Sequence, residues 1–160
     1  RRNLTEDLFR LLNPVDLSTI PLDDALILGD PQAAQQTIVF TDPHCPYCSQ
    51  LHQVLHEAVK ADPNLAFQIK LLPLKPSSQR VAQTIICNRS MEQLEQAFAG
   101  EALPEADCDS DVLEKNRQLA QSLQISGTPT LILPNGQIHP GYRPLAGLLE
   151  LLAENVAEPN

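Results

Sequence analysis

Two cysteines separated by two residues, in Cys45-Pro46-Tyr47-Cys48, are the part of this sequence best suited to chemistry. Thiols at this spacing can close to a disulfide and reopen, exchanging with the thiols or disulfides of another molecule. The run before the motif, 37–40, is apolar and rich in β-branched residues, which predicts a buried strand. The motif therefore lies directly after a predicted strand.

The run after the motif has apolar residues at helical spacing, so we expect a helix over 46–61. A cysteine ordinarily has a pKa of about 8.5, and a helix N-terminus favours its thiolate. Cys45 is thus the predicted nucleophile and Cys48, one turn further in, the resolving thiol. Pro46 suits the first helical turn, and Pro46 and Tyr47 would tune the thiolate. A strand entering a helix through Cys-x-x-Cys is the thioredoxin-like redox pattern, so we interpret the protein as a thiol–disulfide oxidoreductase.

A metal site is an alternative use of the same region. With His52 and His56, the two cysteines form a Cys-x2-Cys-x3-His-x3-His series whose ligand types suit zinc. However, no longer loop folds the cysteine pair back onto the histidine pair. We therefore expect His52 and His56 on the helix surface and predict no metal, while a protonated His44 could stabilise the thiolate.

A Thr-Pro step, Thr128-Pro129, stands at the entrance of the apolar run 130–133. Proline is tolerated at the first residue of a strand, and only X-Pro bonds adopt the cis form at modest cost. A cis turn here could bring the backbone of Thr128 beside the dithiol. An ordinary strand-entry proline is the other reading that the spacing allows.

Two further cysteines, Cys87 and Cys108, have no Cys-x-x-Cys partner. Of the three ways to pair four cysteines, only 87–108 with 45–48 leaves the redox motif intact. Such a bridge would contribute about 3 kcal/mol by constraining the unfolded chain, and it would point to an oxidising compartment. Two free, unrelated thiols are the alternative.

The composition excludes several functions. The 160 residues carry a formal net charge of −9, which argues against binding phosphate backbones or anionic membranes. No apolar run approaches the roughly twenty residues of a membrane span. The first residues are charged and the chain does not begin with Met, so we expect a processed N-terminus without a signal peptide.

The remaining elements predict an α/β protein with a thioredoxin fold and a helical insertion between its two β-α halves. Capping-box patterns, Ser90-x-x-Gln93 and Asp111-x-x-Glu114, indicate helix starts within the insertion. Asn135-Gly136 indicates a hairpin turn. The expected helices are 4–12, 46–61, several within 77–123, and 145–156; the expected strands are 25–28, 36–41, 65–72, 130–133 and 137–139.

Several stretches resemble the catalytic domain of the bacterial periplasmic disulfide isomerases of the DsbC and DsbG type. They are Phe40 to Cys48 with Leu51-His52, Gly127 to Thr130, Asn135-Gly136, Pro140 to Tyr142, and the Cys87/Cys108 spacing. The Pro-Tyr dipeptide is more similar to the DsbG version than to the Gly-Tyr of DsbC.

This resemblance implies that Cys45 is the nucleophile, Cys48 the resolving thiol, Pro129 a cis proline and Thr128 its substrate-contacting neighbour. It favours the bridge between the other two cysteines, a periplasmic location, disulfide-containing or thiol-containing protein substrates, no cofactor, and a DsbD-like membrane reductase as partner. A glutaredoxin-like, glutathione-dependent reductase is the runner-up, because Cys-Pro-Tyr-Cys also occurs there.

The family also has an N-terminal dimerisation domain, for which the residues before the motif are too few. We expect 1–16 to form a linker-like helix and 17–160 to form the catalytic domain, with the oligomeric state left open.

Overall fold

The computed structural model describes residues 4, 5, 8 and 13–158. Most of the helix expected over 4–12, and most of the expected 1–16 unit, lie outside the described residues. The strands are β1 Leu26–Gly29, β2 Gln35–Thr41, β3 Leu65–Leu71, β4 Thr130–Ile132 and β5 Ile138–Pro140. The helices are η1 Leu17–Thr19, α2 Pro46–Ala61, α3 Pro76–Asn88, α4 Met91–Phe98, α5 Val112–Ser122 and α6 Leu145–Glu154.

The five strands form one mixed sheet in the order β1-β3-β2-β4-β5. β2 and β3 run parallel, as expected for strands joined by a helix, and every other neighbouring pair is antiparallel. β2 and β3 are almost entirely buried because both faces of the sheet are covered, which explains their nearly continuous apolar sequences.

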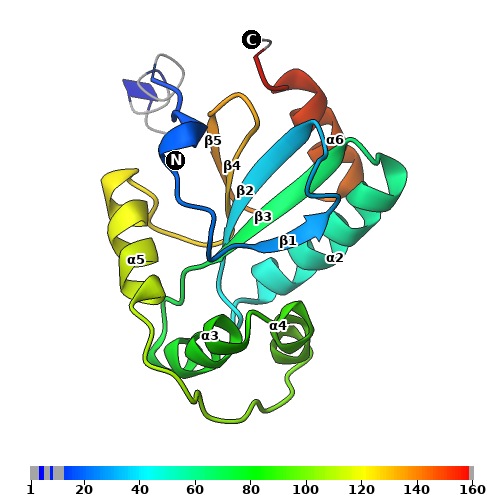
Figure 1. The fold of residues 1–160 in the computed structure, drawn as a ribbon. Coiled ribbons are helices and arrows are strands. Elements are labelled where there is room, and N and C mark those ends of the chain that lie inside the picture. Colours follow the sequence, from blue (N-terminus) through cyan, green and yellow to red (C-terminus); the bar gives the residue numbers. More distant parts are fainter. Residues whose placement is uncertain (1–3, 6–7, 9–12, 159–160) are drawn as a thin grey trace.

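The sheet has an apolar core on each of its two faces. On one face lie α2 and α6, at the right of the sheet in Figure 1, and the core on this face includes Val39, Phe67 and Leu131. On the other face, α5 packs over a smaller cluster that includes Phe40 and Ile132. Successive residues of β2 therefore enter different cores, because side chains alternate across a strand.

The hairpin between β4 and β5 follows the Asn135-Gly136 signal. Gly136 has a φ of +91°, while Asn135 has none of the positive φ that a two-residue Asn-Gly turn requires. The Gly136 N–H donates to Leu133 O at 2.8 Å, and the Leu133 N–H donates to Gln137 O, so the loop is longer than two residues. A β-carbon on Gly136 would lie 2.2 Å from Val15 O, which explains the glycine.

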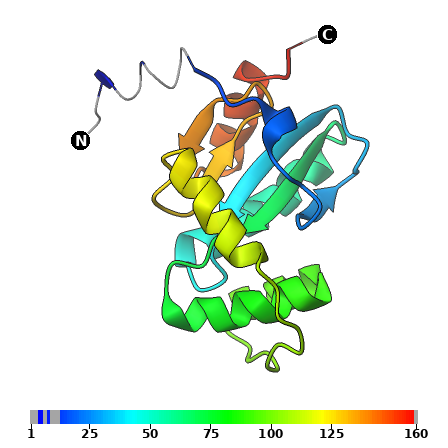
Figure 2. The same cartoon turned by 60° about the vertical axis from the view of Figure 1, so that its left-hand side comes forward.

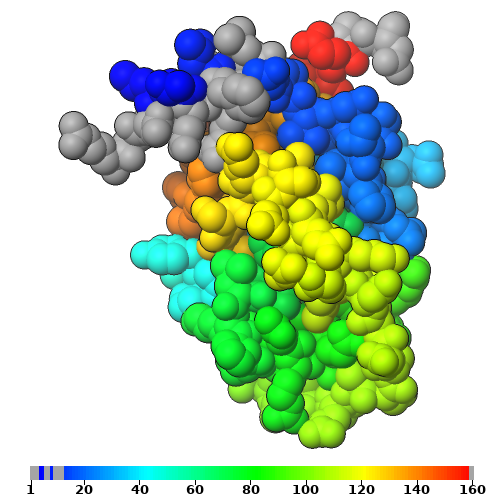
Figure 3. Space-filling view, turned by 90° about the vertical axis from the view of Figure 1, so that its left-hand side faces the viewer, coloured from blue at the N-terminus to red at the C-terminus, as the bar shows by residue number. Residues whose placement is uncertain are grey.

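The predicted helical insertion consists of α3, α4 and α5, placed between the two β-α halves. Figures 1 and 2 show α3 and α4 below the sheet and α5 crossing one of its faces. In Figure 3, α5 (yellow) lies between the blue N-terminal segment and the green α3 on the outer surface. The insertion thus extends one end of the sheet, and the N-terminal end of α2 points toward it.

Local signals located the helix starts but not every cap. The Ser90 hydroxyl accepts the Gln93 N–H at 3.0 Å, as the capping-box pattern predicts. Asp111 is the N-cap residue of α5, so the predicted helix start is confirmed, but its side chain makes no capping hydrogen bond. The Ser110 hydroxyl accepts the Val112 N–H instead, at 3.2 Å. Among the described residues, none of the helices has the length and apolar character needed to cross a membrane.

Candidate active site

Cys45 lies immediately before α2, as its N-cap residue, and Pro46 occupies the first helical turn. The Cys45 backbone is extended. As the N-cap side chain, Cys45 lies beside the unpaired N–H groups of the first turn of α2 and the positive end of the helix dipole. The thiol is partly exposed, and its Sγ donates to Thr128 O at 3.7 Å. Cys45 is therefore placed to react with a molecule outside the protein.

Cys48 has the opposite environment, although it lies three residues away. Only 1% of the residue is exposed, and this burial raises the pKa of the Cys48 thiol to about 12. The Thr41 and Thr128 hydroxyls and the Asp42 N–H, 3.5 Å from Sγ, oppose the rise in pKa by favouring the thiolate. A contact with the Cys45 thiol raises the pKa of Cys48 further. The two sulfurs thus face each other, one accessible and one enclosed.

The loop before β4, which pairs with β2, forms another side of the site. The Thr128–Pro129 peptide bond is cis. The Thr130 hydroxyl donates to Gly127 O at 2.7 Å, and the Gly141 N–H donates to Pro129 O at 2.8 Å, so the loop is tied to the turn after β5. Thr128 therefore reaches both sulfurs, through its carbonyl to Cys45 and through its hydroxyl to Cys48.

Asp42 supports the motif, and the sequence reasoning missed it. Its buried carboxylate accepts the His44 N–H at 2.9 Å, the Leu74 N–H at 2.9 Å and the Ser78 hydroxyl at 3.3 Å. Its own carbonyl accepts the Cys45 N–H at 3.1 Å. The available signal was an acidic residue directly after a buried strand and before a proline. Asp42 joins the motif to α3 of the insertion.

Shallow depressions surround the dithiol. One of about 480 Å³ is lined by Pro43 to Pro46 on one side and by the end of α4 on the other. Another, of about 280 Å³, is lined by 124–130 and part of β5. Tyr47, next to Pro46 in the motif, is 62% exposed. The surface beside the nucleophile can therefore accept an extended segment, and Pro46 and Tyr47 are both reachable from solvent.

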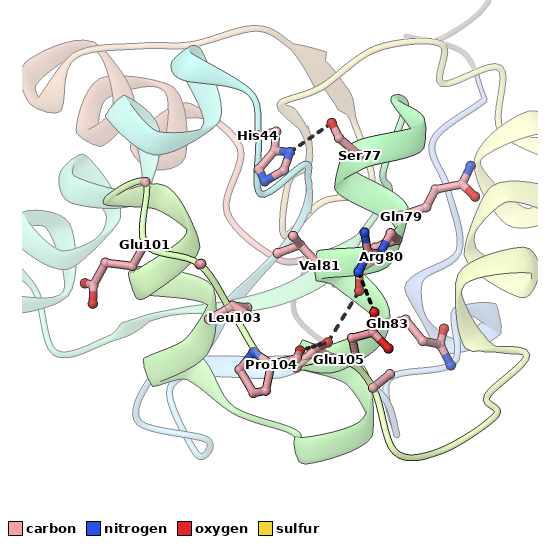
Figure 4. Close-up of a pocket in the computed structure, with 14 residues that line it drawn as sticks. His44, Ser77, Gln79, Arg80, Val81, Gln83, Glu101, Leu103, Pro104 and Glu105 are labelled. Atoms are coloured by element: carbon pink, nitrogen blue, oxygen red, sulfur yellow. Dashed lines mark hydrogen bonds and ion pairs between the residues drawn. The ribbon is translucent and has the colours of Figure 1, made fainter.

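A further cavity, of about 770 Å³, lies between α3 and residues 100–106 and begins at His44. Figure 4 shows His44 facing Ser77 at its rim, with a distance of 3.2 Å between Nδ1 and the hydroxyl. Arg80 and Glu105, which both line this cavity, form an exposed ion pair at 2.8 Å. The His44 ring thus contacts α3 of the insertion.

The two histidines of α2 group with a carboxylate rather than with the cysteines. His52 is buried, which corrects the expectation of a surface residue, because α4 covers this face of α2. Burial also lowers the pKa of His52, against the opposing effect of the nearby Glu95 carboxylate. His52 and His56 both contact Glu95, so the grouping of potential ligands differs from the Cys-Cys-His-His series. Nothing in the sequence pattern singled out Glu95.

The fold and this dithiol define the class of protein. The thioredoxin-like domain family matches residues 22–155, and the chain belongs to that family.

Within that class, the chain is similar to thiol:disulfide interchange proteins. It is 30% identical to a probable thiol:disulfide interchange protein DsbC of Bordetella avium over 99% of this chain and 56% of that protein. It is also 30% identical to DsbC of Escherichia coli, over 82% of this chain and 56% of that protein. The chain thus spans about half the length of these curated relatives.

Solved structures show the same fold. A disulfide interchange protein from Neisseria gonorrhoeae superposes with a TM-score of 0.71 at 26% identity, over 87% of this chain and all of that one. The ScsC protein of Proteus mirabilis superposes with a TM-score of 0.74 over 95% of this chain and 85% of that one. At 18% identity, the second likeness concerns the fold alone.

Proposed function

We propose that this domain is a protein thiol–disulfide oxidoreductase whose nucleophile is Cys45 and whose resolving thiol is Cys48. The observation that carries the proposal is the pairing of an accessible sulfur at a helix N-terminus with an enclosed sulfur one turn behind it. The similarity to thiol:disulfide interchange proteins supports the same chemistry.

In the reducing direction, the Cys45 thiolate attacks one sulfur of a substrate disulfide. The substrate S–S bond breaks, a Cys45–substrate disulfide forms, and the second substrate sulfur leaves as a thiolate that takes up a proton. Cys48 then loses its proton and attacks the Cys45 sulfur, which releases the substrate dithiol and leaves Cys45–Cys48 oxidised. The opposite direction oxidises a substrate dithiol, and the reduction potential of the pair decides which one dominates.

The high pKa of Cys48 suits this order of events. A thiol with a pKa of about 12 is protonated at neutral pH, so Cys48 does not compete with Cys45 for the substrate disulfide. The Thr41 and Thr128 hydroxyls and the Asp42 N–H stabilise the Cys48 thiolate when the second step requires it. Thr128 and Pro129 would hold an extended substrate segment at the dithiol, with Pro46 and Tyr47 on its other side.

We also place the protein in the periplasm, with disulfide-containing proteins as substrates and a DsbD-like membrane reductase as electron donor. The Cys87–Cys108 disulfide supports this location, because stable structural disulfides belong to oxidising compartments. A membrane reductase would return Cys45–Cys48 to the dithiol form by the same exchange chemistry.

Reduction of insulin disulfides tests the proposal. Wild type should catalyse insulin reduction by a thiol reductant, and Cys45→Ser should abolish catalysis. The matched control is Cys87→Ser combined with Cys108→Ser. This double variant replaces cysteines outside the dithiol and should keep its activity as long as it is folded. A Cys45→Ser protein of full activity would refute the proposal. Turnover of a glutathione mixed disulfide without any action on insulin would indicate the glutaredoxin-like alternative.

A further inference from the structure

Two imidazoles and a carboxylate converge where α2 meets α4. Glu95 Oε2 lies 2.9 Å from His52 Nε2 and 2.6 Å from His56 Nε2. The three potential ligand atoms all lie within 4.8 Å of one another. Among the described residues this is the one such group of histidine, cysteine, aspartate or glutamate side chains. None of its members belongs to the proposed exchange chemistry.

The helices hold these side chains in place. His52 and His56 are four residues apart on α2, a spacing that puts both on one face, and their ring centroids are 4.9 Å apart. The Phe98 ring of α4 packs against His52 at 5.1 Å. The His52 side chain is 7% exposed, while those of His56 and Glu95 are each 40% exposed. One ligand is thus anchored in the interior, and two remain accessible to a solute.

Hydrogen bonds alone would explain a helix–helix contact, but the geometry also suits a metal. Zinc binds histidine nitrogen at about 2.0–2.1 Å and carboxylate oxygen at about 2.0–2.2 Å. Ligand atoms around a tetrahedral ion therefore lie about 3.3–3.5 Å from one another. The Glu95 side chain is partly exposed. Moving its Oε2 away from the two histidine nitrogens by less than about 1 Å would bring both oxygen–nitrogen distances into that range.

A cavity beside the cluster supplies an entry path. It has a volume of about 260 Å³ and is lined by the three side chains together with Ser49, Gln53, Phe98 and Ala99. Three protein ligands and an open fourth position are the arrangement of zinc sites that keep a bound water or another ligand. Imidazole suits first-row transition metals, whereas Ca²⁺ and Mg²⁺ prefer oxygen ligands.

We propose that His52, His56 and Glu95 form a binding site for a divalent first-row transition metal such as Zn²⁺. The metal would replace two hydrogen bonds by three coordinate bonds and link α2, which carries the dithiol, to α4 of the insertion. Because the site uses neither sulfur, it can be filled while Cys45 and Cys48 are oxidised. It therefore differs from a metal site built on the Cys-x-x-Cys motif.

Equilibrium dialysis of the full chain against Zn²⁺ tests the proposal, with the Cys45–Cys48 pair oxidised so that its thiols cannot bind the metal. Wild type should bind one Zn²⁺ per chain. His56→Ala and Glu95→Gln should each lower the affinity by more than the roughly ten- to hundredfold that the loss of a second-shell partner costs. The matched control is His139→Ala on β5, which removes a histidine outside the cluster and should bind like wild type.

A second measurement guards against a variant that simply fails to fold. The thermal midpoint of oxidised wild type should rise when Zn²⁺ is added, and that of folded Glu95→Gln should not move. Co²⁺ bound to wild type should show a visible spectrum without a thiolate charge-transfer band. Binding below one equivalent, equal affinity in wild type and both ligand variants, or thiolate bands in the Co²⁺ spectrum would overturn the proposal. Failure here would leave the insulin assay unaffected, since the two sites share no residue.

Discussion

At the scale of single residues, burial distinguishes two chemically identical side chains. Cys45 is partly exposed at a helix N-terminus, whereas Cys48 is 1% exposed within the same helix. The desolvation of Cys48 raises the pKa of its thiol to about 12 and outweighs the hydrogen bonds that favour its thiolate. The proposed division of roles between nucleophile and resolving thiol therefore follows from where one helical turn places each sulfur.

This difference predicts selective alkylation. In the reduced protein at pH 8, iodoacetamide should modify Cys45 and leave Cys48 as a thiol. With a pKa of about 12, Cys48 is almost entirely protonated at pH 8, so its reactivity should increase as the pH rises toward that value. Peptide mass spectrometry measures both sites, and the urea-unfolded chain should label at both as a control. Equal labelling of the two cysteines in the folded protein would contradict the described burial.

A second prediction at this scale concerns Asp42, which accepts three hydrogen bonds. In Asp42→Asn, one of the two oxygens becomes an NH₂ group that cannot accept, so a buried donor is left unsatisfied. We expect a loss of about 1–3 kcal/mol in the free energy of unfolding, measured by urea denaturation.

Asp30→Asn is the matched control for that change. Asp30 is exposed and accepts a single N–H, that of Gln32, a role that asparagine can also fill. Its free energy of unfolding should change by less than about 0.5 kcal/mol. An equal effect of the two substitutions would show that the Asp42 contacts do not support the motif.

At the scale of elements, the insertion holds much of the site although it carries neither active-site sulfur. α3 and α4 provide Ser78 and Glu95, which contact Asp42 and the α2 histidines. The segment 100–111 has no regular structure and is joined to α3 by the Cys87–Cys108 disulfide. The disulfide thus constrains a part of the chain that has few backbone hydrogen bonds of its own.

Removing this disulfide should destabilise the fold without removing the dithiol. The bridge spans 21 residues, and a loop of that length predicts a loss of about 3 kcal/mol for Cys87→Ala combined with Cys108→Ala. Urea denaturation measures the change. Dithiothreitol should lower the urea midpoint of wild type more than that of the double variant. A variant as stable as oxidised wild type would contradict this role.

Local elements were predicted from sequence because local signals specify them. Pro46 after Cys45 and Asp62-Pro63 bracket α2, and its bounds of 46–61 match those of the structure. The last helix ends at Glu154 rather than at the predicted 156, in keeping with the weak signals at helix C-termini. Asp111 is the N-cap residue of α5 without a side-chain cap, and the Ser110 hydroxyl, one residue earlier, accepts the Val112 N–H instead.

At the scale of the whole molecule, the contacts that sequence could not predict join distant segments. Lys70 is buried in β3 and donates to Asp24 Oδ1 at 2.6 Å and to Pro21 O at 2.7 Å. Asn116 of α5 donates to the other oxygen of Asp24, at 3.2 Å. A lysine in a strand gives no sign of its partner, because such a pairing depends on the packing of three elements.

The active site shows the same limit. The Cys-x-x-Cys motif and the Thr-Pro step were visible as local patterns, and the structure brings Cys45 and Thr128 together across 83 positions. The contacts of Asp42 with Ser78 and of His52 with Glu95 also cross long separations, and no periodicity or spacing marks them. The proposed chemistry therefore rests on motifs that are visible in the sequence, whereas the contacts that support the site have no local signal.

Trapping of the mixed disulfide is the most direct measurement of whether Cys45 is the sulfur that exchanges with proteins. Reduced Cys48→Ser should form a disulfide-linked complex with an oxidised protein substrate, because the thiol that would resolve it is missing. Reduced Cys45→Ser should form none. Non-reducing electrophoresis and mass spectrometry of the linked peptides identify the joined residues. A complex linked through Cys45 is the predicted result, and a complex that forms equally in Cys45→Ser would contradict the account.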